Sequence, residues 1–69
     1  MKAMKNRLRV MRAEKRITQL RVALKAKMQP SRLSHIENGH VEPSETERKR
    51  LARALGASLQ DVFPEQVTQ

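Results

Sequence analysis

The segment from Gln29 to Gly39, QPSRLSHIENG, constrains the fold more than any other part of the chain. Pro30 suits the first position of an α-helix, because its fixed φ is compatible with a helix and its missing N–H is not needed there. Gly39 suits the position just after a helix, where a positive φ is required. The sequence therefore predicts a short helix over Pro30–Asn38.

This predicted helix has two unlike sides. At about 100° per residue, Leu33 and Ile36 fall on one side, and Ser31 and His35 point the opposite way. The polar side has no acid and no lysine, and its small or flat groups can both donate and accept hydrogen bonds. Such a side suits the reading of base edges in the major groove, although an ordinary surface histidine at position 35 remains an alternative.

The rest of the chain also predicts helices and no strand. Helix-forming residues dominate, and no alternating apolar pattern is long enough for a strand. Residues with good N-cap side chains precede three of the predicted helices, and Glu47 completes a capping box with Ser44. The predicted helices are Met4–Lys15, Gln19–Ala26 after Thr18, Pro30–Asn38, the helix from Ser44 to Leu55, and a short helix from Ser58 to Phe63. We expect one all-α domain over residues 1–69, with an ordered, mainly aliphatic core over about residues 4–63.

Positive charge is concentrated in the first half of the chain. The formal net charge is +8, and residues 1–34 hold eleven lysines and arginines against one acid, whereas residues 35–69 hold four against six acids. This asymmetry indicates a face that binds a polyanion, and nucleic acid is favoured over a merely solubilising surface. A membrane surface is a weaker alternative, because the chain has only one aromatic residue.

Several classes of protein are disfavoured. The chain has no cysteine and no apolar run of membrane-spanning length, so the sequence predicts a soluble, cytoplasmic protein. The two histidines, His35 and His40, have a weak ligand spacing, and no nucleophile–base arrangement is visible. We therefore predict no metal, no cofactor and no enzymatic activity.

The helices over Gln19–Ala26 and Pro30–Asn38 are separated by a short turn, which is the arrangement of a helix-turn-helix. Leu20 and Leu24 lie on the side of the first of these helices that faces away from its small core residues. They are either isolated surface leucines or part of a surface that binds a protein partner.

The chain resembles the phage-repressor and Cro-like helix-turn-helix family, the XRE-type transcriptional regulators. Three stretches carry the resemblance: RLRVMRAEKRITQ, SRLSHIENGHVEPS and LARALGASLQDVF. It covers about residues 4–63 and implies a compact five-helix, lambda-repressor-like domain. The chain departs from the family pattern at Lys27, where a turn glycine is usual, and at Leu20 and Leu24, where polar residues are usual.

The resemblance also implies roles for individual residues. Arg12 and Glu37 match a buried ion pair, which their places beside the core positions also favour. The positions that match the base-reading part of the recognition helix are Gln29, Pro30, Ser31, Ser34 and His35. The positions that match contacts to the DNA backbone are Thr18, Gln19, Asn38, His40 and Ser44. Arg32 could bind a guanine or a phosphate, and its place on the flank of the helix favours phosphate.

The sequence thus predicts a transcriptional regulator that binds double-stranded DNA at specific sequences, as a homodimer on a two-fold-related operator. One alternative is an antitoxin-type regulator that also binds a partner protein through Leu20 and Leu24. Two further alternatives are a protein-interaction module of the same shape and a protein that coats nucleic acid without sequence preference.

Overall fold

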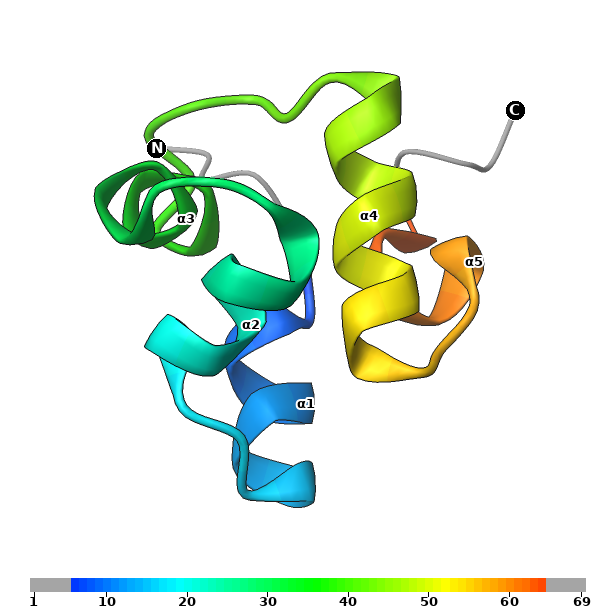
Figure 1. The fold of residues 1–69 in the computed structure, drawn as a ribbon. Helices are drawn as coiled ribbons and strands as arrows, with labels where there is room; N and C mark the ends of the chain where they lie inside the picture. Colours follow the sequence, from blue (N-terminus) through cyan, green and yellow to red (C-terminus); the bar gives the residue numbers. More distant parts are fainter. Residues whose placement is uncertain (1–5, 65–69) are drawn as a thin grey trace.

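A computed structural model describes residues 6–64, and this part of the protein consists of five α-helices and the segments that connect them (Figure 1). They are α1 (Leu8–Lys15), α2 (Gln19–Ala26), α3 (Pro30–Glu37), α4 (Glu45–Leu55) and α5 (Leu59–Val62). No strand occurs within the described range, so the all-α prediction is confirmed. The second helix packs against both α3 and α4, and α4 also contacts α1 and α5. None of these helices is long and apolar enough to cross a membrane.

The core is aliphatic except for Phe63, as the composition predicts. Every helix contributes to it, and its largest fully buried side chains are Phe63, Leu8, Leu33, Ile36, Leu51, Val22 and Val62. Four small buried residues, Ala23, Ala26, Ala52 and Ala54, lie on α2 and α4. Small side chains there let the two helices approach closely. Met28, in the turn before α3, packs against this core from a half-buried position.

The predicted start of the first helix is wrong. The helix begins at Leu8 rather than at Met4, and Met4 itself lies outside the described residues. The Asn6 side chain accepts a hydrogen bond from the backbone N–H of Leu8 at 3.1 Å. The Arg7 N–H donates to the carbonyl of Val62 at 2.9 Å. The backbone before Leu8 is therefore used to join α1 to α5, and the asparagine side chain takes the capping role.

The ends of the other helices follow the local signals in the sequence. Thr18, Ser44 and Ser58 each accept a hydrogen bond from the backbone N–H three residues later, and Ser44 and Glu47 form the predicted capping box. The third helix ends at Glu37, one residue before the predicted end, and Gly39 follows with φ of 78°. These interactions satisfy backbone groups that the helix ends leave unpaired.

Two turns place side-chain-bearing residues in the left-handed region. Arg16 has φ of 57° after α1, and Lys27 has φ of 58° after α2. A glycine adopts this conformation at no steric cost, whereas a residue with a Cβ is strained by about 1–2 kcal/mol. The tight turn between α2 and α3 is therefore kept despite the strain at Lys27.

Candidate nucleic-acid interface

The third helix presents a polar face to solvent. Ser31 and His35 are exposed, whereas Leu33 and Ile36 on the other side are fully buried. Ser34 is half-buried on the flank. The imidazole rings of His35 and His40 have their centroids 5.9 Å apart, so the loop after α3 extends this polar face.

The start of α3 adds two more exposed residues, Gln29 and Pro30. Pro30 is at the first helical position and Gln29 is the N-cap, but its side chain forms no capping hydrogen bond. The Gln29 amide is therefore not used within the helix start, which leaves it available to an external partner.

A buried carboxylate fixes the C-terminal end of α3. The guanidinium of Arg12 donates twice to Glu37, from Nε to Oε2 at 2.6 Å and from the terminal nitrogen to Oε1 at 3.1 Å. The Glu37 side chain has no exposed surface, and that of Arg12 is 17% exposed. The Gln19 amide also donates to Glu37, at 3.1 Å. This cluster joins the C-terminal end of α3 to α1 and to the start of α2.

Two residues that the sequence did not predict add further contacts at the C-terminal end of α3. The Asn6 amide donates to the carbonyl of Ile36 at 3.1 Å. Arg9 donates to the side-chain oxygen of Asn38 and lies 3.9 Å from Glu37. No local pattern marks either residue, because each contact spans about thirty positions of the chain.

A second ion pair fixes α3 to α4. Arg32 donates to both oxygens of Glu47, from Nε at 2.6 Å and from a terminal nitrogen at 2.8 Å. The hydrogen bonds from Arg32, and then the one from the Ser44 backbone, lower the pKa of Glu47 to about 2. The same hydrogen bonds raise the pKa of Arg32. The guanidinium predicted to reach DNA is thus bonded to Glu47, and its contact with DNA stays a prediction.

The predicted backbone-contacting residues lie at helix ends near α3. Thr18 begins α2 and Ser44 begins α4, and both side-chain oxygens are used as caps. Gln19 and Asn38 have the internal partners described above, whereas His40 is exposed. The N-terminal ends of α2 and α4 therefore flank α3, and helix N-termini attract phosphate groups.

Within residues 6–64, no three His, Cys, Asp or Glu side chains are grouped so that they could hold a metal ion.

Comparison with known proteins identifies this arrangement. The sequence profile of the helix-turn-helix family matches residues 8–62, a range that spans α1 to α5. The chain belongs to the helix-turn-helix family. Its match is to the XRE and Cro/C1 type, which agrees with the resemblance noted from the sequence. No curated protein sequence matches this helix-turn-helix protein.

Two solved structures are similar to this helix-turn-helix protein. The restriction-modification controller protein C.AhdI from Aeromonas hydrophila is 27% identical, with a TM-score of 0.77 over 80% of this chain and 83% of that one. The clp gene regulator ClgR from C. glutamicum is 37% identical, with a TM-score of 0.74 over 78% of this chain and 70% of that one. The family and both structures support a DNA-binding transcriptional regulator.

Proposed function

We propose that the protein regulates transcription by binding a specific double-stranded DNA site with α3 in the major groove. The observation that carries this proposal is the exposed polar face of α3, which is held in place by two charged anchors. Glu37 joins one end of the helix to Arg12, and Arg32 joins the other half to Glu47. Reading bases requires side chains with defined positions, and this anchoring supplies them.

Within this proposal, the side chains on and around α3 divide into three groups. Ser31 and His35 face the groove, Ser34 lies beside them, and Gln29 and Pro30 enter at the start of the helix. Pro30 has no N–H to donate, so it contacts a thymine methyl group. Thr18, Asn38, His40 and Ser44 approach the DNA backbone. Gln19 and Arg32 act mainly by holding α3, because their side chains already bind Glu37 and Glu47.

The proposed DNA-bound form is a homodimer. A single recognition helix reads a short stretch of sequence, and two copies related by a two-fold axis double it. The bound site would then be an inverted repeat whose half-site centres are about 34 Å apart. We place this activity in the cytoplasm, and it requires no cofactor.

Selection of bound duplexes from a random-sequence pool tests the proposal. We expect one enriched motif, arranged as an inverted repeat. Enrichment of no motif, together with equal affinity for all duplexes, would favour sequence-independent coating instead. Absence of any DNA binding at low salt would favour a protein-interaction module, and a single asymmetric motif would contradict the dimer.

A further inference from the structure

The outer face of α2 carries two exposed leucines. Leu20 is 57% exposed and Leu24 is 69% exposed. They are four residues apart, so they form one row along the helix. The core residues of α2, Val22, Ala23 and Ala26, lie on the opposite side.

A row of positive charge runs beside the leucines. Arg21 and Lys25 are also four residues apart and exposed, and neither forms an ion pair within residues 6–64. At about 100° per residue, the two rows together span the side of α2 opposite the core. We call Leu20, Arg21, Leu24 and Lys25 the α2 outer face.

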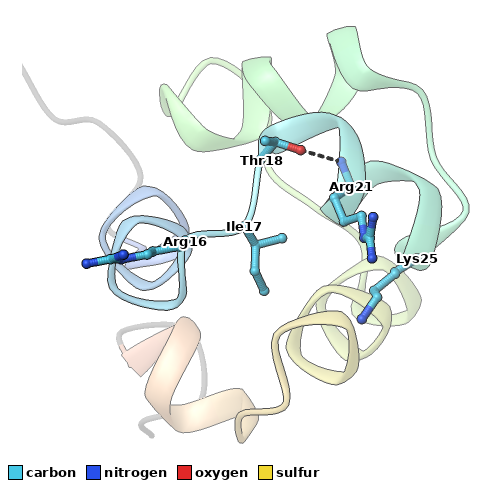
Figure 2. A pocket seen from close by; sticks show the side chains of 5 residues that line it. All are labelled: Arg16, Ile17, Thr18, Arg21 and Lys25. Atoms are coloured by element: carbon cyan, nitrogen blue, oxygen red, sulfur yellow. Dashed lines mark hydrogen bonds between the residues drawn. The ribbon is translucent and has the colours of Figure 1, made fainter.

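The charged edge of this face borders a hollow. The hollow has a volume of about 360 Å³ and is lined by Arg16, Ile17, Thr18, Arg21 and Lys25 (Figure 2). Ile17 packs against the core and gives the hollow an apolar wall. A second hollow, of about 240 Å³, is lined only by cations: Lys25, Lys27, Arg50 and Arg53. Positive charge therefore continues from the α2 outer face toward α4.

The chemistry of this face selects among possible occupants. A DNA backbone would neutralise Arg21 and Lys25, but it would leave the leucines against charged, hydrated phosphates. A second copy docked by two-fold symmetry would bring together two faces of the same positive charge, and this face has no acidic residue to offset it. A protein segment with an apolar row and an acidic row satisfies both halves of the face.

We propose that the α2 outer face binds a second protein through an acidic amphipathic helix. The apolar row of that helix packs on Leu20 and Leu24, and its acidic row meets Arg21 and Lys25. Helix recognition of this kind is common where apolar anchors recur at the spacing of helical turns. Only Thr18, at the edge of the hollow, is shared with the proposed DNA contacts, so the inference goes beyond the DNA-binding function.

A display library of helical peptides of about 18 residues, or about five turns, tests this inference on the intact protein. We expect enriched peptides to carry leucine-like and acidic residues in adjacent rows. Their affinity should fall by about tenfold or more in a Leu20→Ser, Leu24→Ser double variant and in an Arg21→Glu, Lys25→Glu double variant.

Matched controls distinguish binding at the α2 outer face from nonspecific binding elsewhere on the protein. Val10→Ser removes another exposed apolar residue, which is 50% exposed on α1, and should leave peptide affinity unchanged. Lys15→Glu reverses a charge elsewhere on α1 and should also have little effect. Replacing the acidic residues of the peptide by lysine should reproduce the loss from the ligand side, whatever the stability of the protein variants.

Three results would overturn the inference: no enriched peptide, enriched peptides without acidic residues, or binding that the two double variants do not weaken. DNA affinity measured on the same variants distinguishes failure of this inference from failure of the proposed DNA-binding function. The leucine variant should bind its selected duplex as tightly as the parent protein. A loss of DNA affinity in that variant would assign the leucines to the DNA interface instead.

Discussion

At the scale of single residues, the ion pair between Arg12 and Glu37 is asymmetric. The Glu37 side chain is wholly buried, whereas that of Arg12 retains 17% exposure. A charge left without its partner costs more when it has no route to solvent. The two halves of this pair should therefore differ in the cost of their removal.

We predict that Arg12→Met destabilises the fold by up to roughly 3 kcal/mol, because it leaves a buried carboxylate with only the Gln19 amide and the more distant Arg9 as partners. Glu37→Ala should cost less, since Arg12 can turn its guanidinium toward water. Combining Arg12→Met with Glu37→Ala should recover part of the larger loss. Urea unfolding of the three variants measures these differences, and equal stability of Glu37→Ala and the parent would contradict the anchoring role.

Lys27 gives a prediction of the opposite sign. Its φ of 58° strains a residue that has a Cβ, and glycine removes this strain while adding freedom to the unfolded chain. We expect Lys27→Gly to stabilise the protein by about 0.5–1 kcal/mol, or roughly 2–8 °C in Tm. Lys25→Gly, inside α2, is the matched control and should destabilise by about 1 kcal/mol. A lower Tm for Lys27→Gly would show that the lysine side chain stabilises the turn.

At the scale of helices, α3 is positioned by contacts that run across the fold. Arg32 and Glu47 connect it to α4, and Glu37 connects it to α1 and α2. Each anchor pairs side chains at least fifteen positions apart in the chain. The orientation of the polar face therefore depends on tertiary structure as well as on the local helix.

The Arg32–Glu47 contact predicts a pH dependence. Folding lowers the pKa of Glu47 from its ordinary value of 4.5 to about 2. The ionised carboxylate is thus favoured in the folded state, so its contribution is complete above about pH 4.5 and is lost as the pH falls toward 2. Solvent screening at the half-exposed Arg32 keeps this contribution small.

Glu47→Gln tests this effect while it retains a residue that suits the capping box. The difference in unfolding free energy between parent and variant should shrink as the pH is lowered from about 7 to about 2, because the parent loses the charge that the variant lacks. Urea unfolding across this range provides the measurement. A difference that stays constant with pH would mean that the Glu47 charge does not stabilise the fold.

The exposed side of α3 predicts that sequence-specific DNA binding can be weakened without weakening sequence-independent DNA binding. His35→Ala and Ser31→Ala should each weaken binding to the selected duplex by about 1–3 kcal/mol and leave random DNA nearly unaffected. His40→Ala, at an exposed residue proposed to contact the DNA backbone, should weaken both kinds of binding alike, and Gln60→Ala, on α5, is the control. Affinities for both duplexes at one salt concentration decide the outcome. An unchanged ratio for both α3 variants would show that α3 does not read bases in this orientation.

Local signals explain why most helices could be predicted from the sequence. Thr18, Ser44 and Ser58 cap the helices that begin directly after them, and Gly56 ends α4 with φ of 66°. The start of α1 could not be predicted in this way, because the Arg7 backbone bonds to Val62, far along the chain.

The candidate site was less predictable than the helices. The exposed face of α3 follows from helical periodicity alone, and Ser31 and His35 lie where that periodicity places them. Periodicity does not predict the partners of Arg32 and Gln19. Arg32 comes to lie beside Glu47, and Gln19 beside Glu37, only after folding. Sequence patterns identified Glu47 as part of a capping box, and its second role required the placement of α4 beside α3.

At the scale of the whole molecule, the protein carries more positively charged side chains than its internal ion pairs neutralise. Within residues 6–64, eight cations form no ion pair and no side-chain hydrogen bond: Arg7, Lys15, Arg16, Arg21, Lys25, Lys27, Arg50 and Arg53. Together with the net charge of +8, they create a field that attracts a polyanion from a distance.

This charge predicts a steep dependence of DNA binding on salt. Neutralising about five to eight phosphates releases their counterions, which gives a log–log slope of roughly −4 to −7 per domain. We expect Arg9, whose side chain is 63% exposed beside the proposed backbone contact Asn38, to meet a phosphate as well, so Arg9→Ala should make the slope shallower by about one unit. Arg21→Ala should leave the slope unchanged, because Arg21 lies on the face that we assign to a protein partner. Titrations of a labelled duplex at several salt concentrations measure all three slopes. A slope near zero for the parent would contradict DNA binding itself, whereas a shallower slope for Arg21→Ala would place the α2 outer face against DNA.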